Sequence, residues 1–159
     1  MRKSTIWLAS ALLFSATFFS SCKDDKEDVA PKTATKTELL TAKNWRITAF
    51  TYKEGNSPVE DVYTQIDACS KDDFYKFNPD KTFVLDEGAT RCSANDPQTS
   101  VSGWDITADG SILLLLEMKG STSAELFTIT ELTDGKLRIG QSYTGNGSTE
   151  VTEITFTAF

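Results

Sequence analysis

This sequence of 159 residues predicts an all-β fold, an antiparallel up-and-down barrel of eight strands preceded by a short helix. Most of the strand-like segments alternate apolar and polar residues, as half-buried strands do. Four tight-turn sequences join consecutive segments and make the joined strands antiparallel neighbours. Closing such a meander into a barrel removes the unpaired edges that an open sheet exposes. A two-sheet sandwich is the alternative architecture.

A short helix is expected first. Residues 37–43 read TELLTAK, in which Thr37 could cap the helix start. Leu39 and Leu40 could close a barrel mouth or pack against a sheet.

The first three strands follow the helix. Trp45, Ile47 and Ala49 alternate with polar residues and predict a strand at 44–53. Strands at 73–77 and 82–86 lie on either side of Asn-Pro-Asp-Lys (78–81), whose proline suits the second position of a type I turn.

The last five strands are separated by short loops or turns. Strands at 101–107 and 112–118 flank an Asp-Gly turn, and further turns fall at 134–135 and 145–147. The alternating residues are Trp104 and Ile106; Phe127 and Ile129; Leu137, Ile139 and Tyr143; and Ile154, Phe156 and Ala158.

Residues 112–116 are five consecutive aliphatic side chains, so this strand has no polar face to turn toward solvent. The long connection at 54–72 is the expected cover for its outer side. A second copy of the protein or a partner surface is the alternative.

The first 21 residues predict an export signal. Arg2 and Lys3 precede an uncharged, mostly apolar run of 14 residues, Ile6 to Phe19, which is short for a membrane-spanning helix. Ser20-Ser21-Cys22 resembles the bacterial lipobox, in which the cysteine is lipidated and becomes the new N-terminus. A plain secretory signal is the alternative.

A charged tether follows the predicted lipid. Residues 23–28 read KDDKED, which resembles the surface-export signal of Bacteroidetes lipoproteins. The sequence therefore divides into a signal peptide at 1–21, a lipidated cysteine and flexible tether at 22–37, and a barrel domain at 38–159. We expect a protein held on the outer membrane by its lipid and facing the cell exterior.

Two cysteines lie in the long connections on either side of the second hairpin. Cys69 and Cys92 are nearly symmetric about the turn at 78–81, so continued pairing of the hairpin would bring them together. Export permits oxidation, and the sequence predicts a disulfide between them. Two buried free thiols are the alternative.

Composition excludes several function classes. There is no histidine, which removes the usual general base and any Ser-His-Asp or Cys-His site. The charge is −7, and it is −9 once residues 1–21 are removed. Residues 38–159 carry 10 basic and 19 acidic residues, the whole excess, which argues against nucleic-acid binding.

Together these features resemble a known family. They are the lead helix, Asn44-Trp45, a cysteine on each side of FYKFNPDKTF, the SGWDI segment at 102–106, the Asp-Gly turns and a final TFTAF strand. They resemble the lipocalin-like domain lipoproteins of Bacteroidetes, with calycin-like small barrels. The resemblance implies an antiparallel barrel and ligand binding, without naming a ligand.

Ten side chains are candidates for the barrel interior or for contact with a ligand. An eight-stranded barrel can be filled by side chains or can hold one small ligand, and filling is the simpler reading of these residues. They are Trp45, Tyr75, Phe77, Phe83, Leu85, Trp104, Phe127, Ile139, Tyr143 and Phe156.

Acidic pairs at 72–73 and 86–87 flank the same hairpin and could gather carboxylates, but their spacing matches no calcium loop. We therefore predict neither a metal site nor a cofactor.

Three function classes follow. The first is a surface-anchored protein that binds a small apolar or glycan-derived ligand. The second is a non-catalytic accessory protein that docks an envelope partner. The third is a carboxylate-dependent hydrolase, which is disfavoured because nothing distinguishes a catalytic acidic pair from solvated surface charge.

Overall fold

The computed structural model describes residues 33–159, and residues Thr33–Phe159 form one compact unit. The predicted signal peptide, the predicted lipidation site Cys22 and most of the predicted tether lie outside the described residues. The elements are α1 (Lys36–Thr41), β1 (Asn44–Glu54), β2 (Glu60–Asp61), η1 (Tyr63–Gln65), η2 (Ala68–Lys71), β3 (Phe74–Phe77), β4 (Thr82–Asp86), β5 (Thr99–Ile106), β6 (Ile112–Leu116), β7 (Ala124–Leu132), β8 (Lys136–Gly145) and β9 (Ser148–Ala158).

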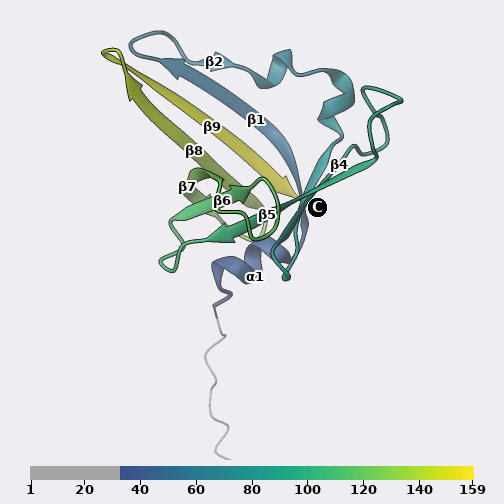
Figure 1. Ribbon diagram of the computed structural model, residues 1–159. Coiled ribbons are helices and arrows are strands. Elements are labelled where there is room, and N and C mark those ends of the chain that lie inside the picture. The colour runs from purple at the N-terminus through teal and green to yellow at the C-terminus, as the bar shows by residue number, and fades with distance from the viewer. Residues whose placement is uncertain (1–32) are drawn as a thin grey trace, which may run out of the picture. The chain divides into compact units, whose positions relative to one another are not determined.

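The strands close into the predicted antiparallel barrel. Neighbours follow the order β1-β3-β4-β5-β6-β7-β8-β9, and β9 returns to pair with β1 from Trp45 opposite Ala158 to Glu54 opposite Glu150. The long strands β1, β9 and β8 lie side by side (Figure 1). Closure rules out the two-sheet sandwich, because β1 and β9 leave no open edges between them.

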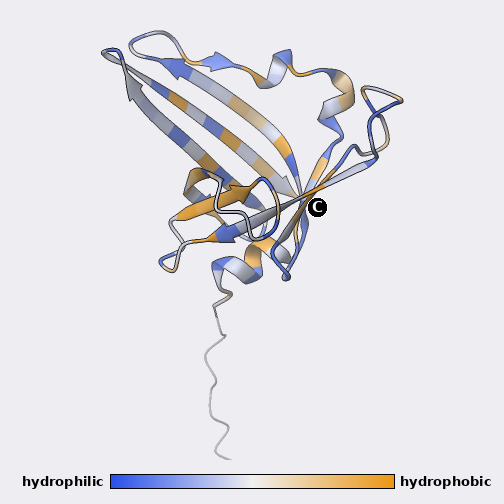
Figure 2. Cartoon of the chain, viewed as in Figure 1, coloured by the Kyte–Doolittle hydropathy of each residue, from blue (hydrophilic) through white to orange (hydrophobic). Residues whose placement is uncertain are grey.

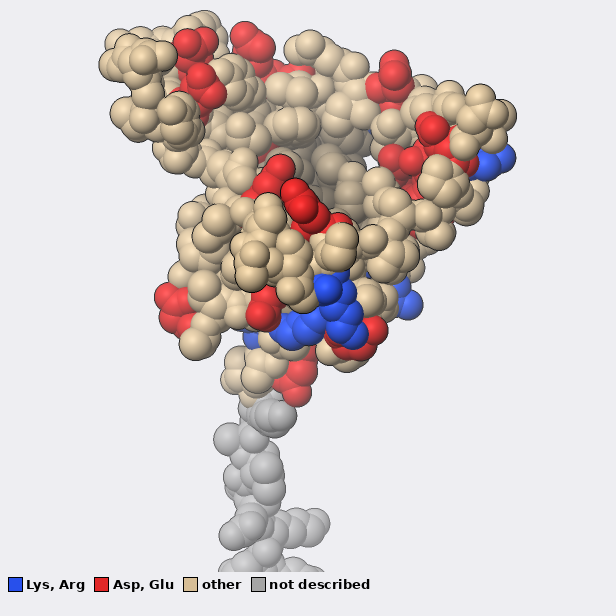
Figure 3. All heavy atoms as spheres, in the orientation of Figure 1, with Lys and Arg blue, Asp and Glu red and all other residues tan. Residues whose placement is uncertain are grey.

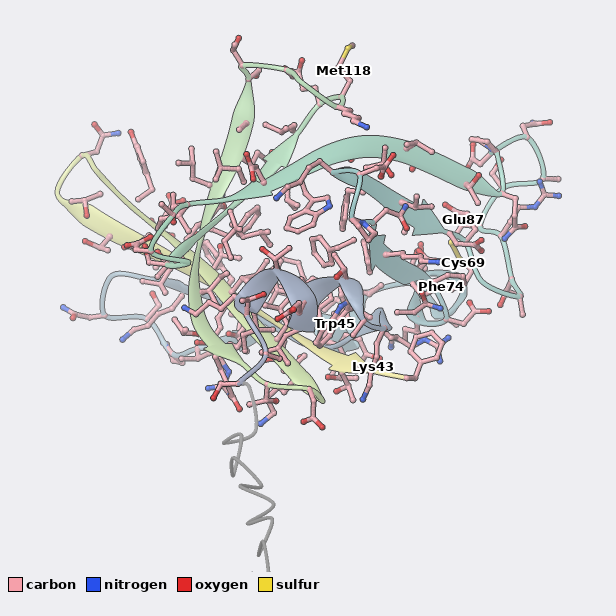
Figure 4. The ribbon with its side chains drawn as sticks, turned by 90° about the horizontal axis from the view of Figure 1, so that it is seen from below. Lys43, Trp45, Cys69, Phe74, Glu87 and Met118 are labelled. Carbon is pink, nitrogen blue, oxygen red and sulfur yellow. A yellow bond between two sulfur atoms is a disulfide. The ribbon has the colours of Figure 1, made fainter. Side chains whose placement is uncertain are left out.

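Helix α1 lies against one end of the barrel. It begins one residue earlier than predicted because Thr35, rather than Thr37, is the cap: its Oγ1 accepts from Glu38 N (3.1 Å), and the Glu38 carboxylate accepts from Thr35 N (2.6 Å). Leu40 is fully buried, and its carbonyl accepts from Trp45 Nε1 (2.9 Å). Seen from below, Trp45 lies behind this helix (Figure 4). The helix therefore closes that end, as the sequence predicts for Leu40.

A packed core occupies the half of the barrel next to α1. Trp45 and Trp104 are its largest side chains. Trp45 Nε1 donates to the carbonyl of Leu40 and Trp104 Nε1 to the carbonyl of Asn78 (2.9 Å), so neither indole leaves a buried donor unpaired. The buried apolar residues are Leu40, Trp45, Phe77, Trp104, Leu113, Phe127, Leu137, Ile139 and Phe156. We call this layer the floor.

A β-bulge changes which side chains of β1 face inward. Ile47 pairs with Phe156, whereas Ala49 pairs with Thr155, so the extra residue Thr48 reverses the alternation. The prediction that Ala49 shares the face of Trp45 is wrong, because the bulge places Phe50 there instead. Alternating colours along β1, β8 and β9 are visible in Figure 2.

The connection between β1 and β3 carries structure that the sequence did not predict. It forms β2, which pairs with β1 at Thr51 and Tyr52, followed by the short helices η1 and η2. Cys69, at η2, is disulfide-bonded to Cys92, as the hairpin symmetry predicts.

The expected cover for β6 is wrong, because β2 and η1 lie against β1 rather than against β6. The outward side chains of β6 are half-buried. The loop at 119–122 borders Leu114 and Leu116 across an outer groove of about 520 Å³. Within residues 33–159 no helix is long and apolar enough to cross a membrane.

Candidate functional site

Above the floor, the inner face of the barrel carries half-buried aromatic side chains instead of a filled core. The Tyr75 ring stacks on Phe83 with centroids 5.8 Å apart and meets Phe156 of the floor edge-on at 5.4 Å. Leu85 is paired with Tyr75 across the β3–β4 hairpin and is also half-buried. These side chains leave the upper half of the barrel incompletely packed.

A pocket of about 410 Å³ lies on this inner face, between β4, β5, β6 and β7. Its inward lining includes Phe83, Ser102, Leu115 and Glu125. The outward register partners Leu116 and Ala124 also line it, so the pocket extends to the edge of the β6–β7 wall. Figure 3 shows the drawn face hollowed in its upper half, with acidic residues around the hollow. Volumes of 300–1,000 Å³ are usual for small-molecule sites. We call the inner face of the barrel above the floor, with this pocket on its β4–β7 wall, the chamber.

The ten predicted interior residues separate into three groups. Six belong to the floor, three lie on the half-buried inner face above it, and one is exposed. The floor residues are Trp45, Phe77, Trp104, Phe127, Ile139 and Phe156, and the upper residues are Tyr75, Phe83 and Leu85.

Tyr143 does not fill the barrel interior, and that prediction is wrong. It lies opposite Glu150 in the part of the β8–β9 hairpin that extends beyond the floor, and 68% of it is exposed. The alternation gave its face correctly, but alternation carries no information on where along the strand the barrel ends.

Six carboxylates line the inner face toward the mouth, on three walls. Glu54 and Glu150 are register partners on β1 and β9, one residue pair beyond the inward Tyr52 on the same face. Glu125 and Glu117 lie on the wall formed by β6 and β7 and border the pocket. Asp73 and Glu87 each lie one residue beyond the Phe74–Asp86 pair of the β3–β4 hairpin.

These carboxylates alter the titration of two inner tyrosines. Burial, followed by the charges of Asp73 and Glu87, raises the pKa of Tyr75 to about 12. Burial and then Glu150, Glu54 and Glu60 raise the pKa of Tyr52. Nearby carboxylates therefore add to the effect of burial on the pKa of both tyrosines.

Asp73 is the most confined of the six. It is only 8% exposed, and its Oδ1 has no hydrogen-bond partner. Burial is the main cause that raises its pKa, and Glu87, Asp72 and Asp86 raise it further. Its neighbour Phe74 points to the outer face, where its ring meets Phe159 edge-on at 5.9 Å.

The neighbouring acids Asp72 and Asp86 hold loops rather than face the chamber. Asp72 Oδ2 accepts from Ala89 N (2.8 Å) and Thr90 N (3.0 Å), and Asp86 Oδ1 accepts from Gly88 N (3.0 Å). A side chain on Gly88 would collide with Asp72, and its φ of +65° also favours glycine. Glu87 and Cys69 lie on this side of the barrel, which is the right-hand side of Figure 4.

Comparison with known proteins gives the family. A model of the lipocalin-like domain matches residues 41–139. The chain belongs to this lipocalin-like family. Members of the family generally bind ligands rather than catalyse reactions. A solved lipocalin-like protein from Bacteroides uniformis is 13% identical to this chain in sequence. The two structures match with a TM-score of 0.43, over 76% of this chain and 99% of that protein. Comparison with curated proteins gave no match.

The ten candidates omit Leu113 and Leu137 of the floor, although the alternation places Leu137 on the face of Ile139, and they omit Asp73. The run at 112–116 hides which leucines face inward, and only its pairing with Phe127 resolves this. Asp73 was visible as part of an acidic pair, but its separation from Asp72 onto the inner face depends on where β3 begins.

Proposed function

We propose that this lipocalin-like chain is a cell-envelope lipoprotein whose barrel binds a small apolar or glycan-derived ligand in the chamber. The observation that carries the proposal is the pocket of about 410 Å³ above a closed floor. Aromatic faces such as Phe83 can pack against apolar ligands or sugar rings, and Ser102 and Glu125 offer polar contacts.

Native mass spectrometry of the protein recovered from its own host tests this function. We expect a bound species at one copy per chain, released when the protein is unfolded. Repeated recovery of the bare protein, together with a solved structure whose chamber is filled by side chains, would contradict it.

The location is a separate part of the proposal and rests on the sequence alone. We propose lipidation at Cys22, a tether at 22–37 and display on the outer face of the outer membrane. Two or three acyl chains hold a protein on a membrane stably. In the host, Cys22→Ser should abolish incorporation of a labelled fatty acid. Cys92→Ser is the control, and it should leave that incorporation unchanged. Labelling that survives Cys22→Ser would refute the anchor.

Docking of an envelope protein is the second candidate function, and the outer face of β5 to β7 favours it. Val101 is 62% exposed and Leu126 is 58% exposed on this face, beside the continuous aliphatic strand β6 (Figure 2). Crosslinking in intact cells would support docking if one stoichiometric partner attaches here and Leu126→Lys removes it. Crosslinks to no defined partner would count against it.

A further inference from the structure

We propose that the chamber selects an organic cation, an ammonium group carried on an apolar body. This inference rests on the proposed ligand-binding function and adds the charge of the ligand. It follows from the distribution of charge between the two faces of the barrel, from Asp73, and from the aromatic floor and walls.

Three outward acids on the strands are paired with bases, whereas none of the six inner-face carboxylates forms an ion pair within residues 33–159. Outward acids pair with bases: Asp105 with Lys81 (2.8 Å), Glu131 with Lys136 (3.5 Å) and Glu153 with Arg138 (3.5 Å). Every lysine and arginine on the described strands points outward by register. They are Arg46, Lys53, Lys76, Lys136 and Arg138. A cation in the chamber would therefore meet carboxylates without a competing base.

The pairing of Glu54 with Glu150 is unfavourable for the empty barrel. Like charges directly opposite each other on antiparallel strands destabilise a sheet. The same pair lies beside Tyr52, two positions along β1 on the same face. A carboxylate pair beside an aromatic ring is a favourable surrounding for an ammonium group.

Asp73 supplies an observation independent of the acidic mouth. A carboxylate that is more than nine-tenths buried normally has a donor for each oxygen, yet Oδ1 has none. By strand alternation it lies on the inner face, one inward position beyond Tyr75. Tyr75 stacks on Phe83, which lines the pocket. Asp73 is not part of the pocket lining, so its unpaired charge would act on a bound cation across Tyr75 and Phe83 rather than by direct contact.

The acids are arranged for a bulky cation rather than for a metal ion. Within residues 33–159 no group of three or more acids or cysteines lies close enough to hold a metal. Hard cations such as Ca²⁺ need six to eight converging oxygens. Carboxylates spread over three walls around aromatic rings suit a charge carried on an organic body.

A matched set of indoles tests the inference. Titration calorimetry would use the full lipidated chain in phosphatidylcholine nanodiscs, with empty nanodiscs as the blank. The probes are tryptamine, a cation; tryptophol, which is neutral; and indole-3-acetate, an anion. We expect tryptamine to bind at least tenfold more tightly than the other two, with an affinity that falls as salt rises.

Variants locate the charge effect. Glu125→Gln in the pocket wall and Asp73→Asn should each weaken tryptamine binding by about fivefold while leaving tryptophol unchanged. Glu153→Gln is the matched control, because it removes the same charge from the outer face. It should leave both affinities unchanged. Circular dichroism confirms that each variant is folded.

The outcomes separate the two proposals. Equal or tighter binding of tryptophol or indole-3-acetate overturns the cation selectivity but leaves ligand binding standing. An equal effect of Glu153→Gln and Glu125→Gln overturns the assignment to the chamber. Binding of none of the three probes overturns the cation selectivity, whereas ligand binding itself is tested separately by native mass spectrometry of the protein from its host.

Discussion

Asp73 is a buried carboxylate with one oxygen that no donor contacts. Residues around it hold the backbone: Asp72 accepts hydrogen bonds from the loop at 89–90, and Phe74 packs on Phe159. The ionised form of Asp73 is therefore opposed by burial and by Glu87. Carboxylates whose pKa is raised by burial and by neighbouring charges are frequent at functional sites.

Replacing this residue should raise stability and lower cation binding. Because the folded-state pKa of Asp73 is raised, its ionisation costs free energy once the pH exceeds the unfolded value, about 3.9. Asp73→Asn should therefore increase the free energy of unfolding at pH 7, and the gain should vanish below about pH 3.9.

Urea unfolding across this pH range measures the effect. Asp105→Asn is the control of opposite sign, because the Lys81 hydrogen bond lowers the pKa of Asp105. That variant should lose stability at pH 7, and its loss should shrink as the pH falls through the lowered pKa. A stability loss in Asp73→Asn at pH 7 would show that its carboxylate has an undetected partner.

At the scale of elements, the order and pairing of strands follow from the sequence, whereas the inward set follows only in part. Tight turns fix four neighbouring pairs, and the predicted meander order extends to the pairs β4–β5 and β6–β7, which longer loops join. The bulge at Thr48 inserts one residue without any glycine or proline signal, and it replaces Ala49 by Phe50 on the inner face. Tyr143 lies on the predicted face but is exposed, because the β8–β9 hairpin extends beyond the packed part of the barrel.

Helix α1 should contribute strongly to stability through one side chain. Leu40 is fully buried against the floor, and truncating a buried leucine removes transfer free energy and leaves a cavity. Leu40→Ala should lower the free energy of unfolding by about 2–5 kcal/mol. Leu39→Ala, at the half-buried neighbour, is the comparison. An equal loss in both variants would contradict the closing role of Leu40.

The disulfide should stabilise the wall that carries Asp73 and Glu87. It joins Cys69 and Cys92 with a sequence separation of 23 residues. Loop-closure entropy for that length predicts a loss of about 3 kcal/mol in the double variant Cys69→Ser/Cys92→Ser. Thermal unfolding with and without reductant checks it. A reductant effect that persists in the double variant would assign the effect elsewhere.

At the scale of the whole molecule, acidic residues without a paired base gather on the inner face of the barrel, toward its mouth. Nineteen acids outnumber ten bases over residues 38–159. Three outward strand acids are paired with bases, whereas six acids lie on the inner face toward the mouth without such a partner within residues 33–159. Composition predicts the excess, but it cannot separate the two faces, because that requires the register of every strand. The floor could be predicted from aromatic spacing, and the chamber above it could not.

A solution-NMR map of methyl chemical shifts during a tryptamine titration tests the central claim most directly. Leu85 and Leu115 face the chamber. Leu114, on the same strand as Leu115, and its register partner Leu126 on β7 face outward. We predict that the two chamber leucines shift with a common saturation curve and that the two outward leucines stay fixed. Shifts confined to Leu114 and Leu126 would contradict binding inside the barrel.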